Sequence, residues 1–145
     1  NDFYKEICGG DLAAVKQTVE AAAEKSHVEV TTLIIESLNG DVREIKALAR
    51  WLAGIDKNIP LHLSRYHPDY RMELPPTRVD VLYELKQVAG EFLNYVYIGN
   101  VFGADNNTYC PGCGNKIVER GYFISVTGLN ESRCSRCNFD ISIIT

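Results

Sequence analysis

The chain has 145 residues, of which 46% are hydrophobic and 23% are charged. This composition is typical of a folded globular protein and excludes wholesale disorder. With a formal net charge of −4 and a pI near 5.4, the chain as a whole does not complement a phosphate backbone or an anionic membrane surface. Its apolar runs are short and no signal peptide is visible, so the sequence predicts a cytoplasmic protein without a membrane partner.

The amino-terminal half alternates between helical and extended patterns. The first predicted helix covers residues 11–25, with Asp11 as its cap. Residues 27–35 (HVEVTTLII) are rich in β-branched side chains and predict a largely buried strand. A second amphipathic helix is predicted over residues 41–54, again with an aspartate, Asp41, at its start.

The same alternation continues through the next forty residues. Residues 60–65 predict a second strand, and residues 66–76 form a loop that holds three of the five prolines. Thr77 is the expected cap of a third helix that ends near Gly90, and residues 94–99 predict a third strand. The three strands begin about 33 residues apart, which is the length of a repeating βα unit.

This order predicts an α/β fold, a parallel βαβαβ arrangement with right-handed crossovers. Three parallel strands need cover on both faces, so either the helices lie on both faces or the strands are an arc of a partial (β/α) barrel. The chain begins at Asn1 and its only methionine is Met72, which favours a piece of a longer protein. We therefore expect residues 1–104 to be part of a barrel, and we expect self-association through its open face.

Residues 105–145 differ in character and predict a separate, small β-rich module. Its cysteines form two C-x2-C pairs with twenty residues between them: Cys110, Cys113, Cys134 and Cys137. Two such pairs supply four thiolates to one tetrahedral metal ion, and a site closed in this way is structural. Two disulfides are the alternative, but the spacing and a reducing compartment favour a metal. We predict a zinc ribbon with strands at 122–126 and 141–144, with iron as the alternative metal.

The rest of the chain carries few chemical signals, because it has no constellation for acid–base or nucleophilic catalysis and no phosphate-binding loop. His67 follows the second strand, at the edge where α/β folds bind ligands, and Tyr66 and Tyr70 flank it. It is either a ligand-pocket residue or a surface histidine in a proline-rich loop. The hydroxyl of Thr31 needs a partner, which is either a polar ligand or the backbone. Cys8 is interpreted as an ordinary thiol.

Several stretches resemble one protein family, the radical S-adenosylmethionine (SAM) proteins of the AmmeMemoRadiSam system, which are relatives of pyruvate formate-lyase activating enzymes. The similarity is to the carboxyl-terminal half of these proteins and covers nearly the whole chain. The stretches are FYKEICG (3–9), HVEVTTLIIESLN (27–39), IPLHLSRYHPDYRM (59–72), PPT (75–77), YVYIGNV (95–101) and NTYCPGCG (107–114). The resemblance implies a partial (β/α) barrel that holds a [4Fe–4S] cluster and SAM, which is cleaved reductively to a 5′-deoxyadenosyl radical.

The resemblance also implies roles for single residues. His67 matches a histidine that lies against the bound cofactor, and Thr31 and Leu33 match strand positions that line the adenosyl pocket. The CxxxCxxC motif that holds the cluster in this family is absent here, so the chain alone is expected to be inactive. The implied partners are the missing amino-terminal half of the barrel and a protein substrate.

A function of another class remains open, a non-enzymatic module in which the zinc ribbon docks a partner and the α/β part serves as scaffold. Binding of nucleic acid by the ribbon is disfavoured, because its basic residues lie among acidic neighbours. These basic residues are Lys116, Arg120, Arg133 and Arg136.

Overall fold

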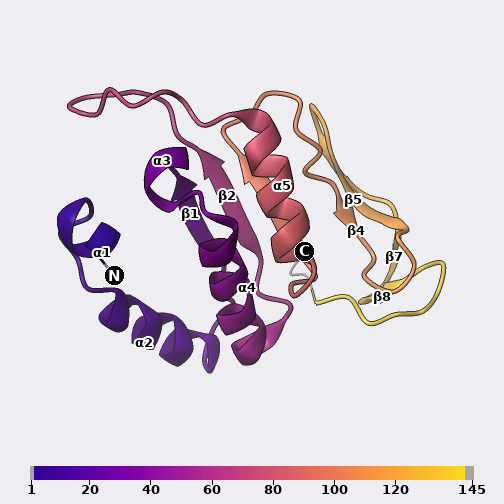
Figure 1. The fold of residues 1–145 in the computed structure, drawn as a ribbon. Coiled ribbons are helices and arrows are strands. Elements are labelled where there is room, and N and C mark those ends of the chain that lie inside the picture. The colour runs from indigo at the N-terminus through magenta and orange to yellow at the C-terminus, as the bar shows by residue number, and fades with distance from the viewer. Residues whose placement is uncertain (1, 143–145) are drawn as a thin grey trace. The chain divides into compact units, whose positions relative to one another are not determined.

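The computed structural model describes residues 2–142. The chain forms two compact units that divide between Val101 and Phe102, three residues before the boundary expected from the sequence. We call them the α/β unit and the ribbon unit, and Figure 1 shows the elements of both. Among the described helices, none combines the length and the apolar character needed to cross a membrane.

The α/β unit has the predicted alternation of helices and strands. Its strands are parallel and lie in the order β1-β2-β3, so the fold is mixed α/β with a parallel three-stranded sheet. The elements are α1 (Asp2–Glu6), α2 (Leu12–Ala23), β1 (Val30–Ile34), α3 (Glu36–Asn39), α4 (Val42–Asp56), β2 (Leu61–Arg65), α5 (Val79–Gly90) and β3 (Val96–Gly99).

Two aspartates begin helices as predicted. The Asp11 carboxylate accepts a hydrogen bond from the Ala13 N–H at 2.9 Å and begins α2. The Asp41 carboxylate accepts one from the Arg43 N–H at 2.7 Å and begins α4. Each carboxylate pairs one of the N–H groups that a helix leaves without an internal partner, so these two boundaries follow from local chemistry.

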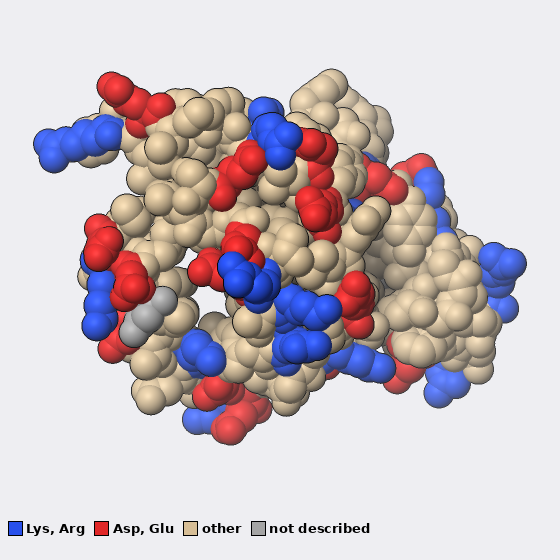
Figure 2. All heavy atoms as spheres, in the orientation of Figure 1, with Lys and Arg blue, Asp and Glu red and all other residues tan. Residues whose placement is uncertain are grey.

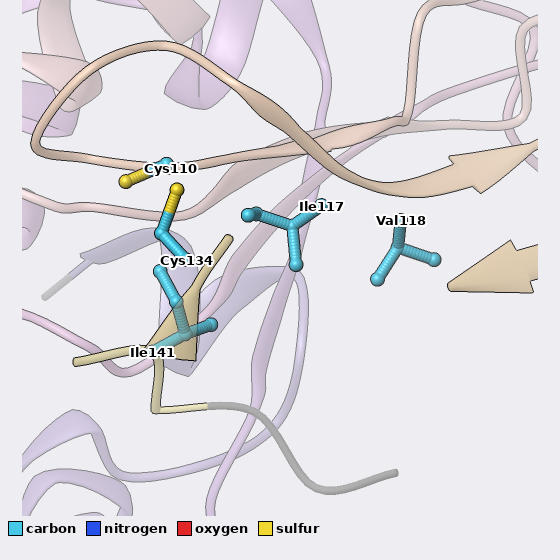
Figure 3. Packing of buried hydrophobic residues seen from close by; sticks show 5 residues of the cluster. All are labelled: Cys110, Ile117, Val118, Cys134 and Ile141. Carbon is cyan, nitrogen blue, oxygen red and sulfur yellow. The ribbon is translucent and has the colours of Figure 1, made fainter. Parts of the chain in front are cut away.

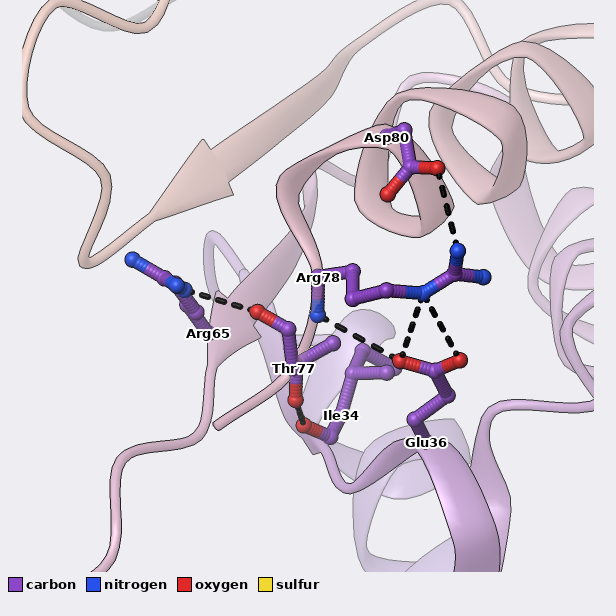
Figure 4. A network of polar contacts seen from close by, with 6 residues as sticks. All are labelled: Ile34, Glu36, Arg65, Thr77, Arg78 and Asp80. Carbon is purple, nitrogen blue, oxygen red and sulfur yellow. Dashed lines mark hydrogen bonds and ion pairs between the residues drawn. The ribbon is translucent and has the colours of Figure 1, made fainter. Parts of the chain in front are cut away.

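The predicted cap of α5 is wrong, because Thr77 has a different role. Its side chain is fully buried and its hydroxyl donates to the Ile34 carbonyl at the end of β1. The Thr77 carbonyl accepts from Arg65 Nε at 2.8 Å, and Arg78 takes the cap position of α5 without a side-chain cap. Arg78 Nε instead donates to Glu36 at 3.1 Å, as Figure 4 shows. Thr77 therefore joins the ends of β1 and β2 to the start of α5.

Helices α4 and α5 cover one face of the sheet. Right-handed crossovers between neighbouring parallel strands in sequential order place both helices on the same side, and Figure 1 shows the two side by side in front of the strands. The apolar residues between these helices and the sheet are almost inaccessible to solvent. They include Ile34, Ile45, Ala49, Leu52, Leu61, Leu63, Leu82, Leu85, Ala89 and Ile98.

The opposite face of the sheet, which we call the open face, is not buried in this way. Across the strands, one row of this face is formed by Thr31, His62 and Tyr97, and the next row by Leu33, Ser64 and Gly99. Thr31 is exposed and Leu33 keeps 44% of its accessible surface, so the prediction of a largely buried strand at 27–35 is wrong for this face. The described strands form an open three-stranded sheet, and the structure does not show a closed barrel.

The outer edge of β1 is partly closed by a side chain. Val30 directs its N–H toward β2, where it donates to the Pro60 carbonyl, so the alternate residues Leu33 and Ile35 direct their backbone groups away from the sheet. The side-chain amide of Asn39 forms hydrogen bonds with these groups. Its Nδ2 donates to the Leu33 carbonyl at 2.8 Å, and its Oδ1 accepts from the Ile35 N–H at 2.7 Å. The carboxyl end of this edge is therefore not available to another strand.

The ribbon unit contains only short strands. They are β4 (Thr108–Tyr109), β5 (Lys116–Arg120), β6 (Ile124–Val126), β7 (Leu129–Asn130) and β8 (Arg133–Cys134), which form an antiparallel sheet β4-β5-β6 and a two-stranded sheet β7-β8. The strand predicted at 122–126 begins at Ile124. The strand predicted at 141–144 is not formed by residues 141–142, and its other residues lie outside the described part of the chain.

The core of the ribbon unit is small. Its cluster of buried side chains, shown in Figure 3, consists of Cys110, Ile117, Val118, Cys134 and Ile141. The backbone packs closely against this core at Gly128, where a Cβ atom would lie 2.1 Å from the Lys116 carbonyl oxygen. Two of the five core side chains are thiols, so the packing of the ribbon unit depends directly on its cysteines.

Candidate metal centre

The two C-x2-C segments fold into matching turns, which we call knuckles. In the first, the Gly114 N–H donates to the Cys110 carbonyl at 2.9 Å. In the second, the Asn138 N–H donates to the Cys134 carbonyl, also at 2.9 Å. Gly114 and Asn138 occupy equivalent positions and both have left-handed backbones, with φ of 70° and 62°. Glycine adopts this conformation freely and asparagine is among the few other residues that tolerate it.

A second hydrogen bond completes the match between the knuckles. The Cys110 N–H donates to the Asn115 carbonyl at 2.7 Å, and the Cys134 N–H donates to the Phe139 carbonyl at 2.9 Å. The ring of Phe139 packs over the first knuckle, where a Cβ atom on Gly112 would lie 2.8 Å from it. The two knuckles therefore hold their thiols with the same pattern of backbone hydrogen bonds.

The four sulfur atoms converge on one point. Their Sγ atoms all lie within 4.8 Å of one another. The distance between sulfurs is 3.6 Å for Cys110 and Cys137, and 3.7 Å for Cys113 and Cys134. Four sulfurs placed about 2.3 Å from a central ion would lie about 3.8 Å apart, whereas a disulfide requires about 2.05 Å. The arrangement fits one tetrahedral metal ion, and none of the four cysteines forms a disulfide.

Without a metal, the close thiols have very different acidities. Burial opposes ionisation of Cys134, but hydrogen bonds from the backbone N–H groups of Cys137 and Arg136 outweigh it and lower the pKa of Cys134 to about 6. The Phe139 N–H favours the Cys137 thiolate, but Cys113, the other sulfurs and burial outweigh this bond and raise the pKa of Cys137 to about 12. Close sulfurs cannot all ionise without a cation, so a metal ion is what allows four thiolates here.

The four cysteines differ in exposure, since Cys113 is half-buried and Cys137 is exposed. Cys110 and Cys134 are buried, and Asn115 Nδ2 lies 3.8 Å from Cys134 Sγ as a weak donor. A metal with four protein ligands has no open coordination position and acts as a structural element. The predicted metal ligands are therefore together in space, and their arrangement suits a structural ion.

The residues matched to the cofactor pocket lie at two places in the α/β unit. Thr31 and Leu33 are on the open face, two residues apart on β1. His67 is exposed, in the loop that follows β2, and no described contact joins it to either of them. Cys8 is exposed in the segment between α1 and α2, far along the chain from the other cysteines.

One polar cluster on the open face did not follow from the sequence. Glu29 binds two histidines, with its Oε1 3.1 Å from His27 Nε2 and its Oε2 2.8 Å from His62 Nε2. The His27 bond, opposed by partial burial and aided by His62, lowers the pKa of Glu29. The His62 ring also stacks on Tyr97, with centroids 5.3 Å apart. These contacts depend on the register of β1 and β2, which sequence spacing does not reveal.

No protein-family profile matches the chain, and no solved structure matches it. The chain is 37% identical over 151 residues to the uncharacterized protein MJ0808 of Methanocaldococcus jannaschii. That match covers 99% of this chain but 45% of the relative, so the chain spans less than half the length of this relative.

Proposed function

We propose that this chain is the carboxyl-terminal part of a radical SAM protein of the AmmeMemoRadiSam type, and that its ribbon unit holds a structural zinc ion. The observation that carries the first proposal is the sequential order β1-β2-β3 with parallel pairing. A barrel winds its strands in sequence with all helices outside, whereas a doubly wound sheet reverses its order and has helices on both faces.

The open face supports the same interpretation. Parallel sheets are normally covered on both faces, yet here Thr31 is exposed and Leu33 nearly half exposed. In a barrel this face is the interior, where the ends of the strands carry the ligands. The partner that would cover it is the amino-terminal half of the barrel, and Asn39 limits the pairing of a further strand to the amino-terminal part of β1.

In the proposed protein, Thr31 and Leu33 would line the adenosyl pocket of SAM, and His67 would lie against the cofactor. Their positions suit these roles, since two are on the open face and the third is at the carboxyl end of β2. SAM supplies the radical chemistry when it is bound together with a reduced [4Fe–4S] cluster. The contribution of this chain is to bind and orient one side of the cofactor.

The cysteines of this chain do not fit the cluster itself. Four of them converge on the metal centre, within 4.8 Å of one another, which leaves room for a single ion only. The fifth, Cys8, is exposed and forms no disulfide, and the α/β unit contains no other cysteine. We therefore propose no cluster-dependent step in this chain, and we expect the chain alone to be inactive.

A titration with S-adenosylhomocysteine, followed by heteronuclear NMR of the 145-residue chain, tests the proposal. We expect shifts for the amides of Thr31, Leu33 and His67, and weaker binding for His67→Ala. Lys57→Ala is the control, because Lys57 is exposed at the carboxyl end of α4, which lies at the opposite end of the strands from His67. Absence of shifts on the open face would contradict the proposal, as would cleavage of SAM by this chain alone.

A second function is favoured by one observation on the ribbon unit. Tyr122, Phe123 and Ile124 are adjacent and keep 97%, 78% and 73% of their accessible surface. The ribbon unit also has equal numbers of basic and acidic residues, four of each, which argues against a nucleic acid partner. The face in Figure 2 likewise mixes Lys and Arg with Asp and Glu. Such an apolar surface favours a protein interaction module, which would bind its partner without binding S-adenosylhomocysteine.

A further inference from the structure

The outer strand of the ribbon sheet has an unprotected edge. β6 pairs with β5 on one side, and among the described strands it has no neighbour on the other. The segment from Gly121 to Gly128 (GYFISVTG) contains no charged residue and no proline. Natural proteins commonly protect exposed edges with these residue types, so this edge is open to pairing with another strand. The edge of β1 differs, because the Asn39 amide occupies part of it.

The hydrogen bonds of the hairpin show which backbone groups face outward. The Gly121 N–H donates to the Phe123 carbonyl and the Thr127 N–H to the Ile117 carbonyl. In an antiparallel pair, hydrogen-bonded positions alternate with positions whose groups point away. The backbone N–H and C=O groups of Ser125 therefore point toward β5. Those of Ile124 and Val126, on either side of it, point away from β5.

We propose that β6 pairs with β6 of a second copy of this chain, in antiparallel orientation about a two-fold axis at Ser125. In this register the backbone N–H and C=O groups of Ile124 pair with those of Val126 in the other copy, which gives two hydrogen bonds. The two-fold axis repeats this pair, so four hydrogen bonds form. Side chains also match, because Val126 lies opposite the buried Val118 within its own hairpin. Ile124 of the second copy would extend this apolar row.

The exposed area suits a second copy. Tyr122 and Phe123 are almost fully exposed, and aromatic side chains bury about 150–250 Å² each. With Ile124 and Val126 added, each copy would bury about 500–600 Å², and the pair about 1,000–1,200 Å², which is at the lower limit of specific interfaces. The ribbon unit carries no net charge, so two copies do not repel each other. We expect a dissociation constant of about 1–100 µM.

Sedimentation equilibrium of the zinc-loaded chain, over about 1 µM to 1 mM and under reducing conditions, tests the pairing. We expect a monomer–dimer equilibrium, and Val126→Lys should raise the dissociation constant at least tenfold. Val42→Lys is the matched control, since Val42 is also partly exposed but lies at the start of α4. A monomer at all concentrations would overturn the proposal, as would a dimer that Val126→Lys leaves unchanged, which would place the interface elsewhere, such as on the open face.

Cross-linking tests the register without a disruptive charge. In a Cys8→Ser background, Ser125→Cys places two thiols at directly opposite positions, with Cα atoms about 4.5 Å apart. Thr127→Cys, on the same strand, places them about 13 Å apart and is the control. In a glutathione redox buffer with zinc at saturation, we expect a disulfide dimer for Ser125→Cys alone. Equal cross-linking of the two variants, or none for Ser125→Cys, would contradict the register.

Discussion

Different interactions stabilise the interior of each of the two units. The α/β unit packs long aliphatic side chains such as Leu52, Leu61 and Leu63 between two helices and one sheet face, and these are completely buried. The ribbon unit has a cluster of five buried side chains, of which two are cysteines of the candidate metal centre. A core of this size does not offset the entropy of ordering more than forty residues.

Because of this difference, a single free energy of unfolding cannot describe the whole chain. Apolar burial stabilises the α/β unit in the absence of any ligand, whereas we expect the ribbon unit to depend on a bound metal ion. Changes that act on one unit should therefore leave the other intact.

Loss of the metal has the largest expected effect. Cys134→Ser, or removal of the ion with a chelator, should unfold the ribbon unit, because ion binding supplies about 10–16 kcal/mol in small zinc domains. In heteronuclear NMR, the amide signals of the ribbon unit should lose their chemical-shift dispersion, while those of the α/β unit should keep it. Cys8→Ser is the control and should retain the metal. A ribbon unit that stays folded without its ion would contradict the account.

Truncation in the α/β core should have the converse effect. Leu63 is completely buried, and Leu63→Ala should lower the free energy of unfolding of this unit by about 2–5 kcal/mol. Leu38, which is 39% exposed, provides the control substitution Leu38→Ala with a much smaller loss. Denaturant unfolding and metal analysis of the same samples check the result. Loss of the metal together with the α/β core would show that the units are not independent.

Two glycines of the ribbon unit pack against neighbours of different rigidity. A Cβ at Gly128 would meet backbone, 2.1 Å from the Lys116 carbonyl oxygen, whereas one at Gly112 would meet the movable Phe139 ring at 2.8 Å. Overpacking against a rigid neighbour costs about 1–3 kcal/mol. Gly128→Ala should therefore weaken metal binding more than Gly112→Ala, as measured by competition with a chromophoric chelator. Equal effects would refute this explanation.

Metal affinity should rise with pH. The pKa of Cys137 is raised to about 12 in the metal-free cluster, so its thiol is protonated at pH 7 and must lose this proton when the ion binds. Protons and metal compete, and release of at least one proton makes affinity increase about tenfold per pH unit near neutrality. Calorimetry in buffers of different ionisation enthalpy measures the released protons. A pH-independent affinity would mean that the four sulfurs are not the ligands.

The smallest expected effect concerns the edge of β1. Asn39→Ala removes two hydrogen bonds, and we expect a loss of about 1–2 kcal/mol in the stability of the α/β unit. The Ile35 amide should also exchange faster with solvent, because Asn39 Oδ1 accepts its hydrogen bond. Ser37→Ala, an exposed neighbour on α3, should leave both quantities unchanged. An unchanged exchange rate in Asn39→Ala would show that the amide does not protect this edge.

The sequence predicted what local chemistry decides. The alternation of helices and strands follows from side-chain periodicity, and the helix starts at Asp11 and Asp41 follow from capping. The cysteine spacing predicted which four cysteines lie close together in space. In the first knuckle the left-handed position is taken by Gly114. In the second knuckle Asn138 has the same backbone conformation, but an asparagine in this position is not a specific signal.

Tertiary contacts decide what the sequence did not predict. Thr77 resembles a helix cap, yet its hydroxyl binds the Ile34 carbonyl, 43 residues away. The apolar character of β1 predicted burial, but burial depends on what lies over each face, and only one face is covered here. The Glu29–His62 pair likewise arises from the register of two strands. The assignment to a radical SAM protein is a proposal, which is based on the resemblance of the sequence to that family.

X-ray absorption spectroscopy of the purified chain, combined with metal analysis, tests the central claim most directly. The account predicts one zinc ion per chain, surrounded by four sulfur atoms at about 2.3 Å. A disulfide within the cluster, or a first shell that contains nitrogen or oxygen, would contradict it.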